Sequence, residues 1–116
     1  MATLHIDVTI DDSGKALTAT FDGDSSVDKN GNIWFTQKKS KTRKNWKIKW
    51  ELDKKGSYKF TGDGVTYSDP DGQISGRIKN DYSVEVTNAN SKVSVVTYSL
   101  WVNGQEIHPM ITNRDG

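Results

Sequence analysis

The residues best suited to binding chemistry lie in one basic run, residues 38–50, with the sequence KKSKTRKNWKIKW. This run holds seven of the sixteen lysines and arginines, no acidic residue and two tryptophans. Cations bind phosphate groups, and aromatic rings stack on the bases of single-stranded nucleic acids. The candidate residues for binding an anionic ligand, either nucleic acid or an acidic glycan, are therefore its basic side chains: Lys38, Lys39, Lys41, Arg43, Lys44, Lys47 and Lys49.

The alternation inside this run argues against an aromatic binding platform. In WKIKWEL, Trp46 and Trp50 fall on the apolar face of a strand, whereas Lys47 and Lys49 fall on the other face. We therefore expect both tryptophans to be buried and the lysines to face water. Lysines on an exposed strand also have a simpler explanation, since they block association between sheet edges. Nucleic acid is for this reason the less favoured partner.

Catalytic groups are sparse in this chain. It has no cysteine, which excludes thiolate metal sites and cysteine nucleophiles, and its two histidines, His5 and His108, lie near opposite ends. His5 lies on the polar face of the first predicted strand, and two histidines alone do not make a transition-metal site. No set of residues converges in the sequence as a nucleophile with its base or as paired carboxylates. The sequence therefore predicts a protein that is not an enzyme and has no cofactor.

The segment DGDSSVDKNGNI raises the question of calcium. Asp28, Asn30 and Asn32 follow the first, third and fifth positions of an EF-hand loop. The glycine precedes the third of these positions, however, and Lys39 stands where the bidentate glutamate belongs. Asp, Asn and Gly are also common in any exposed turn. We predict no metal site, and a weak calcium ion in the loop from Asp22 to Asn32 stays an open alternative.

The elements that must position these residues are strands. LHIDVTI, WKIKWEL and VSVVTYSLWV alternate with a period of two, and turn sequences such as DDSGK, DPDG and NGQ recur about every 8 to 12 residues. No segment shows a helical period. The sequence predicts one all-β domain over residues 1–116, an antiparallel β-sandwich of about eight or nine short strands that is immunoglobulin-like in outline.

The longest predicted strand, residues 93–102, carries the candidate interface. Val96, Tyr98 and Leu100 share the face that we assign to the core. Trp101 and Val95 fall on the opposite face, where a half-exposed tryptophan can anchor a partner. We predict self-association, as a homodimer, or binding of another protein through this face.

Composition and hydropathy predict where in the cell the protein resides. The chain has 116 residues, 33% of them hydrophobic, and a formal net charge of +1. No apolar run approaches the roughly 20 residues of a membrane helix, and MATLHIDVTIDD lacks the features of a signal peptide. The sequence therefore predicts a soluble, cytoplasmic protein that does not interact with membranes.

The motifs W-x-L, Y-x-F-x-G-x-G-V, Y-x-L-x-V-x-G and H-P-x-I-x-N follow one another in residues 46–113. This order of motifs resembles a family of small bacterial proteins, the single-domain β-sandwich proteins of the DP-EP type. The family closes with Asp-Pro-x-Ile-x-Asn, and this chain has His108 in place of the acid. The matching residues are Trp50, Leu52, Tyr58, Phe60, Gly62, Gly64, Val65, Tyr98, Leu100, Val102, Pro109, Ile111 and Asn113. The resemblance implies a β-sandwich, and because the family has no established activity it implies no functional residue.

Three functions follow, in order of preference. The first is a non-catalytic interaction module that binds a protein partner or a second copy of itself. The second is a binder of an anionic ligand through residues 38–49. An enzyme comes third, because the sequence shows no convergent catalytic groups.

Overall fold

The alternating segments form strands, as predicted. The computed structural model describes residues 2–23, 26–36, 45–53, 57–91 and 94–114, and these residues form ten strands and no helix. The strands are β1 (Ala2–Asp11), β2 (Thr18–Asp22), β3 (Ile33–Thr36), β4 (Trp46–Leu52), β5 (Phe60–Ser68), β6 (Ile74–Lys79), β7 (Ser83–Asn88), β8 (Ser94–Val102), β9 (Gln105–Ile107) and β10 (Met110–Arg114).

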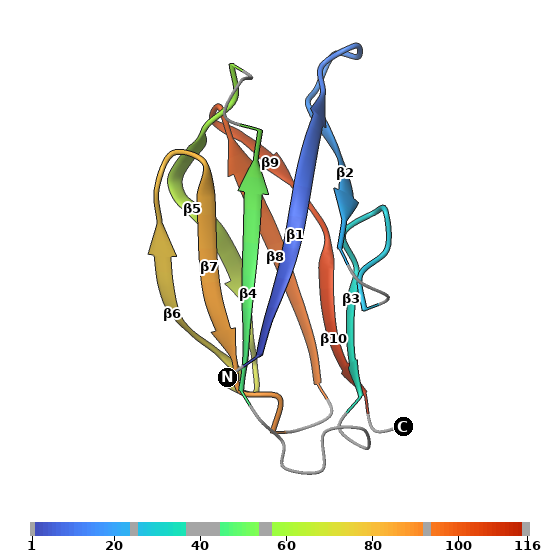
Figure 1. Ribbon diagram of the computed structural model, residues 1–116, viewed down its shortest axis with the longest axis vertical. Coiled ribbons are helices and arrows are strands. Elements are labelled where there is room, and N and C mark those ends of the chain that lie inside the picture. The colour runs from blue at the N-terminus through green and yellow to red at the C-terminus, as the bar shows by residue number, and fades with distance from the viewer. Residues whose placement is uncertain (1, 24–25, 37–44, 54–56, 92–93, 115–116) are drawn as a thin grey trace.

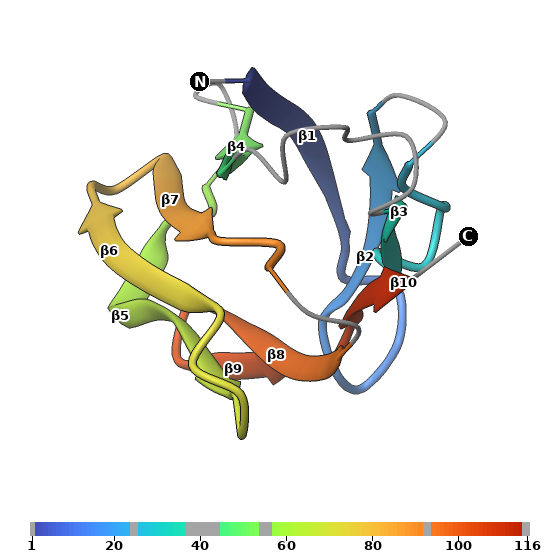
Figure 2. The ribbon, with the colours of Figure 1, turned by 90° about the horizontal axis from the view of Figure 1, so that it is seen from below.

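The strands form two sheets that face each other (Figures 1 and 2). Sheet A has the order β2-β1-β4-β7-β6, and sheet B has the order β3-β10-β8-β5, with β9 paired to β8. This confirms the predicted β-sandwich, while its immunoglobulin-like outline stays a prediction. Most neighbouring strands are antiparallel, but β1 pairs with β4 and β3 with β10 in parallel. The chain enters sheet B at β3 before it returns to sheet A at β4, so β1 and β4 are not joined by a hairpin.

The ten segments agree with the predicted number of strands once β9 and β10 are considered together. β5 pairs with one edge of β8, and β9 and β10 both pair with the other edge. His108 and Pro109 separate the two segments, and proline has no N–H group for the ladder. Counted as one interrupted strand, they bring the number to nine.

The core lies between the inner faces of the two sheets. Trp50 is completely buried and its ring centroid lies 4.9 Å from that of Tyr98, so these two side chains join sheet A to sheet B. Trp46 is less buried than predicted. Trp46 does face the core, but it is only half-buried because it is the first residue of β4, at the end of sheet A.

A hydrogen bond also joins β8 to the loop that leads from β2 in sheet A to β3 in sheet B. The Tyr98 hydroxyl donates a hydrogen bond of 2.7 Å to the carbonyl oxygen of Gly31. Burial raises the pKa of Tyr98 far above its usual value, so the hydroxyl keeps the proton that it donates. Gly31 has a φ of +86° and a Cβ atom here would lie 2.7 Å from Pro109, so only glycine fits without strain.

Candidate functional site

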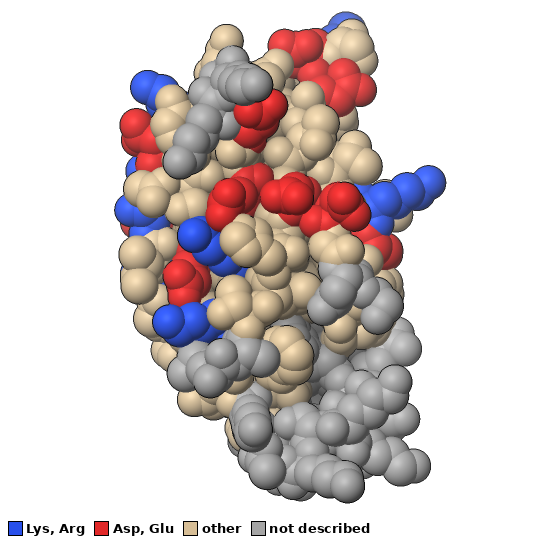
Figure 3. All heavy atoms as spheres, in the orientation of Figure 1, with Lys and Arg blue, Asp and Glu red and all other residues tan. Residues whose placement is uncertain are grey.

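Charged side chains cover the outer face of sheet A. The strand register places Asp7 beside both Asp22 and Glu51, and it places Lys49 between His5 and Glu85. Figure 3 shows acidic side chains in a row across this face, with basic side chains below them. The alternation that buries Ile6 and Trp50 thus directs the charged side chains between them toward water.

Ion pairs organise this surface. Glu51 Oε1 lies 2.5 Å from His5 Nε2 and 3.5 Å from Lys49 Nζ, and Lys47 Nζ lies 3.4 Å from Glu85 Oε1. The hydrogen bond from His5 is the main reason that the pKa of Glu51 falls below its usual value, and Lys49 lowers it further. Glu51 is therefore an anion whose charge is already balanced by its neighbours.

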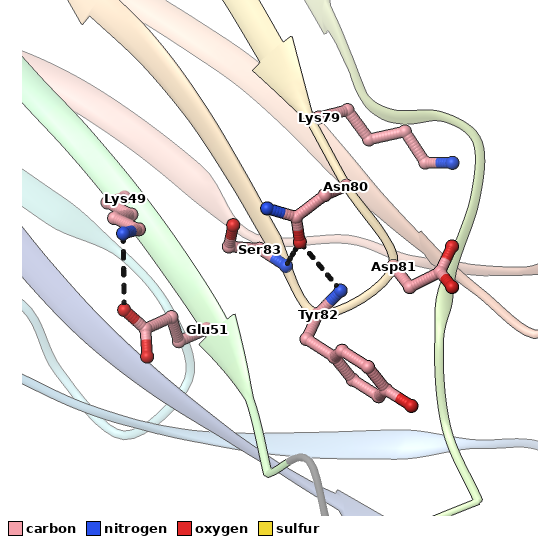
Figure 4. A pocket seen from close by; sticks show the side chains of 7 residues that line it. All are labelled: Lys49, Glu51, Lys79, Asn80, Asp81, Tyr82 and Ser83. Carbon is pink, nitrogen blue, oxygen red and sulfur yellow. Dashed lines mark hydrogen bonds and ion pairs between the residues drawn. The ribbon is translucent and has the colours of Figure 1, made fainter.

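A pocket of about 680 Å³ opens where this face meets the turn between β6 and β7. It is lined by Lys49 and Glu51 from β4 and by five consecutive residues that end β6 and begin β7: Lys79, Asn80, Asp81, Tyr82 and Ser83. Figure 4 shows the β4 side chains on one side of the pocket and the Tyr82 ring and Asp81 on the other, with Ser83 and Asn80 between them. Its volume lies within the range of small-molecule sites, about 300–1,000 Å³.

The turn that forms one wall of the pocket is fixed by both sheets. The carbonyl oxygen of Tyr82 accepts a hydrogen bond of 2.8 Å from Leu52 N at the end of β4, and that of Asp81 accepts one of 2.8 Å from Phe60 N in β5. Asn80 Oδ1 accepts hydrogen bonds from the backbone N–H groups of Tyr82 and Ser83, at 2.9 and 2.8 Å. The wall is thus built before any ligand arrives, which lowers the entropic cost of binding.

The predicted anion-binding residues are only partly within the described part of the chain. Lys38, Lys39, Lys41, Arg43 and Lys44 lie outside it. Lys47 and Lys49 lie on the outer face of β4, opposite the tryptophans, which confirms that the aromatic rings and these lysines point in opposite directions. Both lysines are paired with glutamates, so neither contributes an unbalanced positive charge.

The two predicted interface residues do not form a common patch. Val95 is 52% exposed near the start of β8. Trp101 lies near the other end of the strand, half-buried, and its Nε1 donates a hydrogen bond of 2.8 Å to Thr66 Oγ1. Thr97 and Ser99 separate them on the same face, so any partner would meet two small apolar spots and not one surface.

The structure does not bring the two histidines together, but it gives His108 partners that the sequence did not indicate. Ser99 Oγ lies 3.1 Å from His108 Nδ1, and His108 Nε2 lies 3.1 Å from Glu106 Oε1. Ser99 and His108 also line a shallow pocket of about 460 Å³ on sheet B. A hydroxyl, an imidazole and a carboxylate in this order are the arrangement of a nucleophile, its base and the group that orients the base.

The N–H groups of β8 are not directed toward the Ser99 hydroxyl. Enzymes that catalyse acyl transfer aim hydrogen-bond donors, often backbone N–H groups, at the developing oxyanion beside the nucleophile. Ser99 lies within β8, which has β5 on one edge and β9 and β10 on the other. The N–H groups of such a strand point along the sheet to its neighbours, whereas the Ser99 side chain projects from the face. This serine–histidine–glutamate chain therefore orders His108 on the surface and has no oxyanion site in its own strand.

The loop that resembles a calcium site uses its carboxylate for a turn. Asp28 Oδ1 accepts hydrogen bonds of 2.9 Å from the N–H groups of Asn30 and Asn32, and Oδ2 accepts one of 3.1 Å from Asn32 Nδ2. A cation would have to replace these donors.

In the described part of the chain no three His, Asp or Glu side chains are grouped closely enough to hold a metal ion. Over the same residues no helix is long and apolar enough to span a membrane.

Sequence reasoning missed the pocket beside the β6–β7 turn. Nothing in the sequence places residues 80–83 against β4, which lies much earlier in the chain, so the pocket could not be foreseen.

Comparison with protein-family models and with curated proteins gives no match for this chain. The resemblance to the DP-EP type therefore stays a prediction.

Proposed function

We propose that this protein is a non-catalytic binding module whose ligand site is the polar pocket beside the β6–β7 turn. The observation that carries the proposal is the rigid turn, whose backbone is hydrogen-bonded to β4 and to β5. The turn is held against charged side chains of β4, and together they border a pocket with a volume sufficient for a small molecule.

The geometry around Ser99 supports the non-catalytic part of the proposal, because the N–H groups of β8 point to the neighbouring strands and not toward the Ser99 hydroxyl. Self-association and the binding of an anion through residues 38–49 remain separate proposals, as does a cytoplasmic location. The described surface favours neither of the two binding proposals, since Lys47 and Lys49 have counterions and the exposed apolar residues are scattered.

A screen of small polar molecules by ligand-observed NMR tests the proposal. The library should contain sugars, amino acids, nucleotides and dicarboxylic acids, and each hit should be repeated with Tyr82→Leu and Tyr67→Leu. Tyr82 lines the pocket, whereas Tyr67 is a partly exposed tyrosine on β5 and serves as the matched control. We expect hits that Tyr82→Leu weakens and Tyr67→Leu leaves unchanged. A library without hits, or hits that are equally sensitive to both substitutions, contradicts the proposed site.

A further inference from the structure

The charges that line the pocket beside the β6–β7 turn cancel. Lys49 and Lys79 contribute two positive charges, and Glu51 and Asp81 contribute two negative charges. Both carboxylates already have a cation nearby, since Glu51 lies 3.5 Å from Lys49 and Asp81 lies 4.0 Å from Lys59. A strongly charged ligand would meet like charges here at least as often as opposite ones, and such contacts are costly. The pocket therefore suits a ligand without net charge.

The hydrogen-bonding groups of the pocket further restrict the chemical class of the ligand. The carboxylates of Glu51 and Asp81 only accept hydrogen bonds, and the ammonium groups of the two lysines only donate them. The oxygen of Asn80 is occupied by two backbone N–H groups, which leaves its amide NH₂ as the donor for a ligand. Figure 4 shows this nitrogen on the side of the carboxamide away from Tyr82.

A hydroxyl group satisfies both kinds of partner at once, because it donates one hydrogen bond and accepts others. Neighbouring hydroxyls can donate to a carboxylate while they accept from a lysine or from the Asn80 amide. A phosphate, in contrast, is an anion that mainly accepts hydrogen bonds, so the two carboxylates would oppose it. A basic peptide side chain only donates, so the two lysines would oppose it.

Tyr82 adds an apolar surface to this polar set. Its side chain is half-buried and lines the pocket across from Glu51 (Figure 4). The face of an aromatic ring carries partial negative charge and attracts the weakly positive hydrogens of C–H groups. A sugar ring presents such C–H groups on one face and hydroxyls at its rim, which matches a tyrosine beside alternating donors and acceptors.

On this basis, and resting on the proposed function, we propose that the pocket beside the β6–β7 turn binds a neutral saccharide. Glu51 and Asp81 accept from its hydroxyls, Lys49, Lys79 and Asn80 donate to them, and Tyr82 packs against the C–H face of one ring.

The test is a titration of the ¹⁵N-labelled protein with a panel of ligands, followed by amide chemical shifts. The panel contains neutral oligosaccharides built from glucose, galactose, mannose and N-acetylglucosamine, together with inorganic phosphate and glycine. We expect a neutral saccharide to shift the amides of residues 49–51 and 79–83. Tyr82→Leu and Asp81→Asn should each weaken this binding about tenfold. Both substitutions keep the backbone carbonyls that hold the turn, and Tyr67→Leu serves as the control.

Each other outcome overturns the saccharide inference in a distinguishable way. If phosphate or glycine shifts residues 79–83 and no saccharide does, the pocket binds a ligand of another class and the proposed function stands. If no member of the panel shifts these amides, the saccharide inference fails, and the polar-molecule screen decides the proposed function separately. If a saccharide binds with equal strength to the wild type and to Tyr82→Leu, the site lies elsewhere.

Discussion

At the scale of single residues, Trp50 shows how the fold depends on the alternation in β4. Its side chain is completely buried against Tyr98, whereas Trp46 is half-buried and Lys47 lies on the outer face. We expect Trp50→Ala to lower the free energy of unfolding by about 3 to 5 kcal/mol and Trp46→Ala to lower it by about 1 to 2 kcal/mol. Lys47→Ala should change it by less than about 0.5 kcal/mol. Urea unfolding measures all three, and equal losses would show that the register is wrong.

Substitutions at two glycines distinguish the cost of backbone strain from the cost of steric crowding. Gly31 and Gly62 both have positive φ, +86° and +58°. A Cβ atom at Gly31 would lie 2.9 Å from the Phe21 ring, whereas one at Gly62 would meet nothing within 4 Å. Gly62→Ala should therefore cost only the strain of a left-handed residue, about 1 to 2 kcal/mol, and Gly31→Ala about 1 to 3 kcal/mol more. Equal costs in thermal unfolding would contradict the packing described around Gly31.

The contribution of Glu51 to the stability of the protein should depend on pH. Its pKa is lowered in the folded protein, so its contribution to stability is complete above the pKa of the unfolded chain, about 4.3. This contribution is lost as the pH falls through the lower folded value. Because Glu51 is partly exposed, the loss should stay below about 1 kcal/mol. Glu51→Gln should flatten the stability curve below about pH 4.3, and an unchanged curve in urea unfolding would refute the role of this carboxylate.

At the scale of elements, the strands were predictable and their pairing was only partly so. A period of two identified β1, β4 and β8 and the faces that they bury, because side chains alternate between the two sides of a strand. Pairing depends on contacts between segments far apart in the sequence, so the parallel pairs β1–β4 and β3–β10 were not foreseen. The pocket was missed for the same reason, since it exists only because the β6–β7 turn is bonded to β4 and β5.

The role of the basic segment, residues 38–49, can also be tested. If residues 38–49 bind nucleic acid through charge, each phosphate contact adds about 0.7 to 0.9 to the logarithmic salt slope, so four contacts give a slope of about minus three. We expect no such binding at physiological salt, because Lys47 and Lys49 are paired with glutamates and the net charge is only +1.

Fluorescence anisotropy with labelled single- and double-stranded oligonucleotides measures this binding. A salt-sensitive complex that disappears when Lys38, Lys39, Lys41, Arg43 and Lys44 are neutralised together would establish the alternative function. The melting temperature of that variant should stay nearly unchanged, which separates lost binding from lost folding.

At the scale of the whole molecule, the two outer faces differ in character. Sheet A presents paired charges, and the outer face of sheet B presents hydroxyls around Ser99 and His108. The exposed large apolar side chains in the described part of the chain, Tyr67, Ile78 and Val95, lie on three different strands. Stable interfaces bury about 1,200 Å² or more in total. Self-association through so scattered a surface should therefore be weak.

Sedimentation equilibrium over a wide range of concentrations tests this expectation. A monomer at micromolar concentration that dimerises only at much higher concentration agrees with it, and Val95→Asp should then shift the equilibrium toward the monomer. A tight dimer that is insensitive to Val95→Asp and to Trp101→Ala would show that another surface, such as a sheet edge, forms the interface.

The measurement that tests the central claim most directly is chemical-shift mapping of the strongest ligand found in the polar-molecule screen. The claim is that the pocket beside the β6–β7 turn is the binding site of this protein. It predicts that the shifted amides cluster at residues 49–51 and 79–83 and that Tyr82→Leu removes most of the shifts. Shifts confined to residues 38–44, or to Val95 and Trp101 on β8, would contradict it.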